Sequence, residues 1–109
     1  MTNLLHARCQ AAGLEPMGES DLRHHLEQVN GWRLEGGAIE KTFSFRNYYE
    51  TISFVNALAW IAHTEDHHPD LRVTYDRCLV RFSTHSAGGV TRNDFICAAK
   101  ADALVSFVA

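Results

Sequence analysis

The sequence lacks the cysteine patterns by which small domains form disulfide bonds or bind metal ions. Its three cysteines, Cys9, Cys78 and Cys97, are an odd number, lie far apart and include no C-x-x-C pair. They therefore indicate neither a disulfide framework nor a thiolate zinc site. This use of cysteine is typical of a reducing compartment, and we expect a cytoplasmic protein.

The sequence also lacks an excess of positive charge and any long apolar run. A formal net charge of −3 does not supply the basic surface that neutralises phosphates, so binding to nucleic acid through bulk electrostatics is not expected. No stretch approaches the roughly 18 consecutive apolar residues of a membrane-spanning helix, and the first residues show no basic region followed by an apolar one. Neither membrane insertion nor export is predicted.

The chain does have the composition of one small globular domain. Its 109 residues are 46% apolar and 21% charged, so a single hydrophobic core fits and a second domain does not. Residues 1–17 show weak periodicity and carry Gly13 and Pro16. We predict a loosely attached N-terminal lead-in over these residues and a folded domain over residues 18–109.

Local patterns in the first half of the domain predict a helix and then a hairpin. From Ser20 to Asn30, apolar residues recur at helical spacing, with Ser20 as N-cap and Asn30-Gly31 as the stop. Apolar and polar residues then alternate on both sides of Gly36-Gly37, a pair that can adopt the positive φ of a tight turn. A β-hairpin fits this pattern.

A longer helix is predicted next. Asn47 and Glu50 match a capping box at its start. Its apolar stripe contains Ile52, Val55, Ala59 and Ala62, widened by Phe54, Leu58 and Ile61. We expect this helix to be the most buried of the set. Because Pro69 disfavours helical backbone at the preceding residue, the helix should end at His67 or His68.

A second hairpin and a last helix complete the pattern. Val73 to Phe82 alternates around a predicted turn at Asp76-Arg77, and Thr91 with Asp94 forms a capping box. The predicted order is α-ββ-α-ββ-α. Two hairpins separated by a helix indicate an α+β two-layer sandwich, with a four-stranded antiparallel sheet and three helices on one face. Two sheet edges and an open face favour association of copies of the chain.

Histidine is the residue type that points to chemistry. Seven are present, and His63, His67, His68 and His85 cluster between positions 63 and 85. Imidazole titrates near neutral pH, so two such side chains can donate and accept protons in one reaction. The alternative for adjacent histidines at a helix end is a solvated cap of the last carbonyl groups. His24-His25 lies on an ordinary amphipathic helix, and we assign it no role.

A metal site is another interpretation of the same cluster. His63 and His67 are spaced i, i+4, so both can ligate one zinc ion from one helix face, with His85 as a third ligand. The H-E-x-x-H metalloprotease motif is absent, because Glu65 stands one place later than that motif requires. A non-protease zinc site stays open on ligand types alone.

The spacing of these residues resembles the signature of a known family, the pterin-4a-carbinolamine dehydratases. The match begins with His63, His67, His68 and Pro69. It continues with Tyr75 after five intervening residues, His85 after nine more and Asp94 after eight more. The stretches EDHHPDL, STH and GG-x-T-x-x-D resemble the same family. The predicted order of helices and strands is also that of the family, so the resemblance covers roughly residues 18–109.

The resemblance implies a hydro-lyase that converts 4a-hydroxytetrahydropterin to quinonoid dihydropterin and water. This step recycles the pterin after an aromatic amino-acid hydroxylase has used it. The family implies no metal and no organic cofactor. The open sheet edges and face lead us to expect a homodimer or homotetramer. From the chemistry of the reaction we predict that His67, His68 and His85 are catalytic, with His68 and His85 exchanging protons with the substrate and His67 holding its orientation. The implied pterin-binding residues are His63, Asp66, His67, His68, Ser83, Thr84, His85 and Asp94, with His63 at a position that is often Glu in the family.

Two other classes of function remain beside the enzyme. Animal members of the family are also dimerisation partners of a homeodomain transcription factor, so an interaction module of the coactivator type is the first alternative. A histidine-ligated metal-binding protein is the second. We favour the enzyme because its histidines lie on two separate elements, which a scaffold does not need. The preferred pterin side chain, the identity of acid and base, and the choice between dimer and tetramer do not follow from the sequence.

Overall fold

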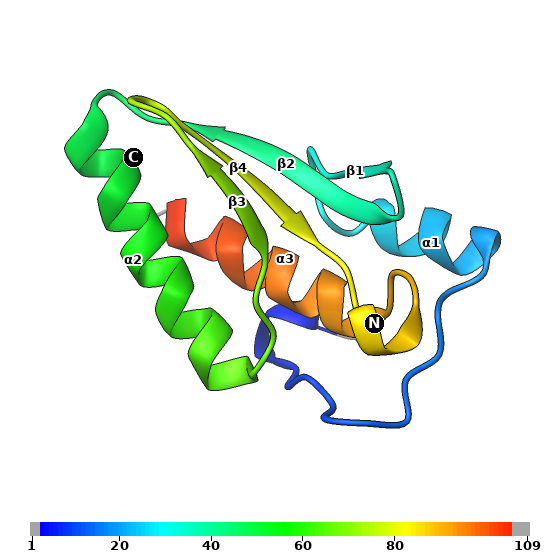
Figure 1. Ribbon diagram of the computed structural model, residues 1–109. Coiled ribbons are helices and arrows are strands. Elements are labelled where there is room, and N and C mark those ends of the chain that lie inside the picture. Colours follow the sequence, from blue (N-terminus) through cyan, green and yellow to red (C-terminus); the bar gives the residue numbers. More distant parts are fainter. Residues whose placement is uncertain (1–2, 106–109) are drawn as a thin grey trace.

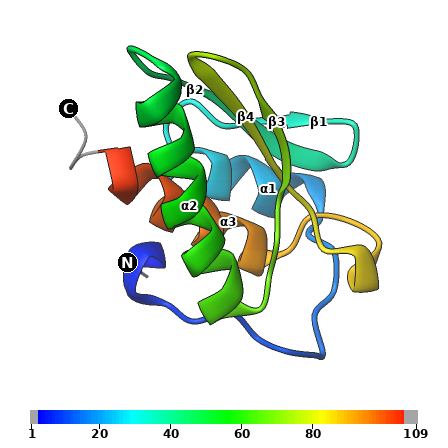
Figure 2. The same ribbon diagram turned by 60° about the vertical axis from the view of Figure 1, so that its left-hand side comes forward.

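A computed structural model describes residues 3–105 as one sheet covered on one face by helices (Figure 1). The elements in chain order are η1 (Leu4–His6), α1 (Glu19–Leu26), β1 (Arg33–Glu35), β2 (Ala38–Ser44), α2 (Tyr48–Glu65), β3 (Asp70–Val73), β4 (Arg77–Phe82), η2 (His85–Ala87) and α3 (Arg92–Val105). The strands are antiparallel and lie in the order β1-β2-β4-β3. Figure 2 shows α1, α2 and α3 on the same side of the sheet, so the predicted α+β two-layer sandwich is confirmed.

The two hairpins form where alternation and turn residues predicted them. Gly36-Gly37 joins β1 to β2 with φ angles of 57° and 79°, the left-handed backbone that a tight hairpin turn requires. The second turn lies earlier than the predicted Asp76-Arg77. Arg77 already belongs to β4, and its carbonyl accepts a hydrogen bond from the Thr74 N–H at 2.9 Å across the turn.

Helix α1 is displaced from its prediction at both ends. Its N-cap is Gly18, which makes no side-chain capping bond, so Ser20 is not the cap. The helix ends at Leu26, and the chain reaches β1 through turns in which Val29 is 2% exposed. The N–H groups of Gln28 and Val29 donate to carbonyls three residues earlier, so the chain leaves α-helical geometry before Asn30-Gly31.

The most buried helix is α3, not α2. It lies in the middle of the helix layer, between α2 and α1. On the α1 side, the ring of Phe95 in α3 is 5.1 Å from the ring of His25 in α1. Helix α2 flanks the layer and buries Thr51, Phe54, Leu58 and Glu65. The predicted stripe of Ile52, Val55, Ala59 and Ala62 is half-buried or exposed. This follows from its position, because a flanking helix has only one face against the core.

No helix within residues 3–105 has the length and apolarity to cross a membrane.

Helix α2 ends at Glu65 rather than at His67 or His68. Asp66 adopts left-handed backbone with φ of 52°, and the His67 N–H donates to the Ala62 carbonyl at 3.0 Å. This Schellman motif closes the helix before the following proline restricts the chain. The two histidines therefore lie in the non-helical connection to β3 and not at the last helical turn.

The N-terminal lead-in is anchored to the helix layer, contrary to the prediction of loose attachment. The Cys9 N–H donates to Glu65 Oε1 at 2.8 Å, and the Asn93 side chain exchanges two hydrogen bonds with the Gln10 backbone, at 2.9 and 2.8 Å. Leu4 is buried against the core. These anchors are side chains far away in the sequence, so the weak periodicity of residues 1–17 carried no sign of them.

Candidate active site

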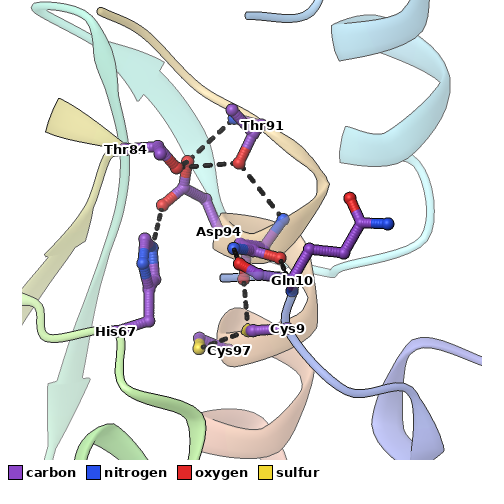
Figure 3. A network of polar contacts seen from close by, with 8 residues as sticks. Cys9, Gln10, His67, Thr84, Thr91, Asp94 and Cys97 are labelled. Atoms are coloured by element: carbon purple, nitrogen blue, oxygen red, sulfur yellow. Dashed lines mark hydrogen bonds and ion pairs between the residues drawn. The ribbon is translucent and has the colours of Figure 1, made fainter. Parts of the chain in front are cut away.

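A buried carboxylate, Asp94, is the centre of a polar network at the start of α3 (Figure 3). Its side chain is 0% exposed. Oδ1 lies 2.6 Å from Nε2 of His67, while Oδ2 accepts hydrogen bonds from the Thr84 hydroxyl and the Thr91 backbone N–H, each at 2.9 Å. Three donors thus satisfy a carboxylate that burial without partners would destabilise.

The hydrogen bonds of this network run in one direction, toward the carboxylate. Because the Thr84 hydroxyl donates to Asp94, the Thr91 hydroxyl 2.7 Å away donates to Thr84. The Thr91 oxygen in turn accepts from the Asn93 N–H at 3.3 Å. His67 donates from Nε2, which leaves Nδ1 as the acceptor whenever the ring is neutral.

The network forms because two local motifs meet. Thr91 and Asp94 make the predicted capping box of α3, in which the carboxylate accepts from the Thr91 N–H. Thr84 directly follows β4, and its N–H donates to the Gly89 carbonyl at 3.0 Å. The loop between these residues is thereby closed, and the end of β4 is joined to the start of α3.

The ring of His67 is held by packing as well as by hydrogen bonding. Its side chain is 11% exposed. It stacks on Phe82 of β4, with 6.0 Å between ring centroids and an interplanar angle of 11°. A ring fixed on one face and at one nitrogen has a defined orientation, which suits a positioning role.

A second pair of histidines lies outside this network. His68 follows His67 after α2, and His85 begins η2 after β4. Both residues are exposed, and their ring centroids are 6.3 Å apart with an interplanar angle of 40°. Two exposed imidazoles from separate elements therefore face the same region, where one small molecule can contact both.

The other predicted site residues differ in their positions. Asp66 is exposed at the end of α2, and Ser83 is half-buried beside the Thr84 network. His63 is exposed on α2, with its ring 5.5 Å from that of Trp60. Within residues 3–105, no three His, Cys, Asp or Glu side chains are grouped to hold a metal ion, so the His63, His67 and His85 site considered above does not form.

The chain matches the family model of pterin 4 alpha carbinolamine dehydratase over residues 15–104. It belongs to this family. A protein of Stenotrophomonas maltophilia named pterin-4-alpha-carbinolamine dehydratase is 60% identical over 105 residues, covering 93% of this chain and 90% of its own. A relative of the same name from Nitrosospira multiformis is 50% identical over 96 residues, covering 88% of this chain and 84% of its own.

Among solved structures, this member of the pterin-4a-carbinolamine dehydratase family is similar to a protein from Brucella melitensis. That crystal structure is described as a transcriptional coactivator/pterin dehydratase. The TM-score is 0.79 at 33% identity, covering 83% of this chain and 98% of the other. The resemblance recognised in the histidine signature, and the fold that it implied, are confirmed.

Three residues of the polar network around Asp94, or in contact with it, are not predicted as site residues by the sequence. Thr91 was predicted only as a helix cap, although the capping box already placed it beside Asp94. Phe82 was one residue of an alternating strand, and Asn93 carried no signal. Only the packing of β4 against the helix layer brings the Phe82 ring beneath His67.

Glu65 is the acidic residue at the end of α2 whose pKa is shifted. Burial raises this pKa. The hydrogen bond from the Cys9 N–H and the positive charges of Lys100 and Arg8 together lower it by more, so the pKa lies below its ordinary value. Arg8 Nε is 3.1 Å and Lys100 Nζ 3.9 Å from Glu65 Oε2. The carboxylate that anchors the lead-in is therefore ionised at neutral pH.

Proposed function

We propose that this chain dehydrates 4a-hydroxytetrahydropterin to quinonoid dihydropterin and water. The match to the family model and the names of relatives at 60% and 50% identity support a pterin-4a-carbinolamine dehydratase activity. The structural observation that carries the mechanism is the pair His68 and His85, two exposed imidazoles 6.3 Å apart.

The reaction needs two proton transfers and no electron transfer. In a carbinolamine the adjacent nitrogen lone pair forms a C=N bond as the C–O bond breaks. An imidazolium donates a proton to the departing hydroxyl, which leaves as water, and a neutral imidazole accepts the proton of the ring N–H. The protein keeps the same number of protons overall, and each well-placed group accelerates the step by about 10²- to 10⁴-fold.

We assign the proton transfers to His68 and His85 and the orientation of the site to His67. His67 also contributes to the acid–base balance, since its Nδ1 stays available while Nε2 is bound to Asp94. Asp94 and Thr84 have buried side chains, so they act by holding His67. Residues predicted to bind the pterin beside the histidines are His63, Asp66 and Ser83.

The source of the substrate is an aromatic amino-acid hydroxylase in this proposal. Such an enzyme leaves the hydroxyl group on the pterin, and this chain removes it as water so that the pterin can be reduced again. A homodimer or homotetramer and a cytoplasmic location are parts of the same proposal. Sedimentation equilibrium tests the assembly, and a monomer at all concentrations would contradict it.

An interaction module of the coactivator type is the second candidate function. The Brucella neighbour is described as both a transcriptional coactivator and a pterin dehydratase. The uncovered face of the sheet and its edge strands, β1 and β3, supply a surface for a protein partner in this chain. A His68→Ala variant that loses dehydration and keeps its association state would show that activity and association depend on different residues.

The decisive test is stopped-flow absorbance of 4a-hydroxytetrahydropterin generated in situ by a hydroxylase. We expect strong acceleration of its decay by this protein in the presence of EDTA. Decay at the uncatalysed rate would contradict the proposed dehydration. Acceleration that disappears on adding EDTA would contradict the two-histidine mechanism and favour a metal site.

A further inference from the structure

Two cysteines that the proposed mechanism does not use lie side by side. Sγ of Cys9, in the lead-in, is 3.6 Å from Sγ of Cys97, in α3 (Figure 3). Cys9 is half-buried and Cys97 is fully buried. The third cysteine, Cys78, is buried in β4 and has no sulfur contact with this pair among the described residues.

The backbone around Cys9 is held on the surface of the helix layer. Its own N–H donates to Glu65, and the next residue, Gln10, exchanges two hydrogen bonds with Asn93 of α3. These contacts keep the Cys9 sulfur over Cys97. A disulfide needs an S–S distance of about 2.05 Å, which rotation of the two side chains toward each other can approach from the observed contact.

We propose that Cys9 and Cys97 are an oxidation site that closes to an intramolecular disulfide when the protein meets a peroxide. The proposal is independent of the proposed dehydratase activity, because neither thiol contacts the histidines of the site. The Cys9–Cys97 disulfide would tie the lead-in to α3, one helical turn after Asp94. A thiol reductant reverses it.

The exposure of the two thiols determines the order of reaction. Cys9 meets the peroxide first, because Cys97 is covered. The hydrogen bond with Cys9, together with burial, raises the pKa of Cys97 above its ordinary value, so Cys97 stays a thiol until its partner is oxidised. This order makes Cys9 the oxidised residue and Cys97 the resolving residue.

The chemistry balances in two steps. An S–O bond forms at Cys9 as the O–O bond of hydrogen peroxide breaks, giving a sulfenic acid and one water. Cys97 Sγ then attacks Cys9 Sγ, so that the S–S bond forms and the S–O bond breaks. The hydroxyl leaves with the proton of Cys97 as a second water. Two thiols lose two electrons, and the peroxide accepts them.

The test uses the full chain with Cys78→Ala, which leaves the proposed pair as the only cysteines. Reduced protein is treated with a small excess of hydrogen peroxide, alkylated, and digested with trypsin. Cleavage after Arg8, Arg23, Arg92 and Lys100 separates Cys9 and Cys97 into peptides 9–23 and 93–100. We expect these two peptides joined by a disulfide, and an intact mass lower by two hydrogens.

Thermal unfolding gives a second measurement of the same link. The cross-link joins residues 88 positions apart, so it restricts the unfolded chain strongly. Oxidised protein should unfold at a temperature at least about 5 °C above that of the reduced protein, and dithiothreitol should abolish the increase. The matched control is Cys9→Ser in the same Cys78→Ala background, which should show no increase.

Three results would overturn the proposal. One is recovery of both peptides as alkylated thiols after peroxide treatment. Another is Cys9 oxidised to sulfinic acid while Cys97 stays reduced, since this shows that Cys97 does not resolve the sulfenic acid. The third is a disulfide between the Cys9 residues of two copies, seen as a doubled mass without the 9–23 to 93–100 link.

Discussion

Two consecutive residues, His67 and His68, occupy opposite environments in this protein. The first is 11% exposed, bound to Asp94 and stacked on Phe82, whereas the second is exposed beside His85. The difference shows that two adjacent histidines in a sequence need not share one environment. The buried ring is fixed in orientation by its partners, and the exposed ring stays accessible to a solute.

This contrast leads to a testable separation of stability from activity. Substitutions in the exposed pair should reduce catalysis and leave the free energy of unfolding unchanged. Substitutions in the buried network should mainly reduce the free energy of unfolding, because they leave buried polar groups without partners. The following experiments compare the two environments, from the largest expected effect to the smallest.

The largest effect is expected from His68→Ala and His85→Ala. Each should lower kcat/KM for 4a-hydroxytetrahydropterin by about 10²- to 10⁴-fold, because each removes a proton-transfer group. The free energy of unfolding in urea should change by less than about 0.5 kcal/mol, since both side chains are exposed. His24→Ala on α1 is the matched control for an exposed histidine. Two variants with wild-type kcat/KM would show that the assignment is wrong.

Asp94→Asn tests the buried side of the comparison. The amide turns an NH2 group toward donors that need an acceptor, and we expect a loss of about 2–4 kcal/mol in the free energy of unfolding. Urea denaturation measures this loss, with the exposed Asp21→Asn as control. A variant as stable as the control would mean that the carboxylate does not hold the network together.

Thr84→Val removes one hydroxyl from the same network at nearly constant volume. It takes away a donor to Asp94 and an acceptor for Thr91, and should lower the free energy of unfolding by about 1–2 kcal/mol. Thr42→Val, at an exposed position of β2, is the matched control. An equal effect of both substitutions would argue against a contribution from the Thr84 hydroxyl.

Glu65→Gln tests the anchor of the lead-in through its pH dependence. The folded pKa lies below the ordinary value of 4.5, so the ionised group stabilises the fold above that pH. This stabilisation is lost as the pH falls through the folded pKa. The difference in unfolding free energy between wild type and variant should be about 1 kcal/mol at pH 7 and should shrink as the pH falls below 4.5 through the folded pKa. A difference independent of pH would contradict the ionic anchor.

The smallest effect is expected from His63→Ala. His63 is exposed beside Trp60 and is proposed to bind the pterin without transferring a proton, so kcat/KM should fall by less than about threefold, or under about 0.7 kcal/mol. Steady-state kinetics at several pterin concentrations measures it. A loss of tenfold or more would contradict this minor binding role.

Local signals explain the parts of the fold that were predicted well. Gly36-Gly37 adopts the positive φ angles of its turn, and the Thr91 and Asp94 cap forms as expected. Each is stabilised within a few residues, so sequence patterns contain it. Helix α2 ends earlier than its sequence pattern predicts, because Asp66, a residue other than glycine, takes the left-handed position that closes the helix before Pro69.

The sequence by itself determined the order of elements, the residue types of the site and the placement of histidines on two segments. The tertiary structure alone decided which histidine is buried. His67 and Asp94 are 27 positions apart, and Cys9 and Glu65 are 56 apart. Such contacts depend on how the sheet, the helices and the lead-in pack together. No local pattern encodes them, because their energy is gained only when distant segments meet.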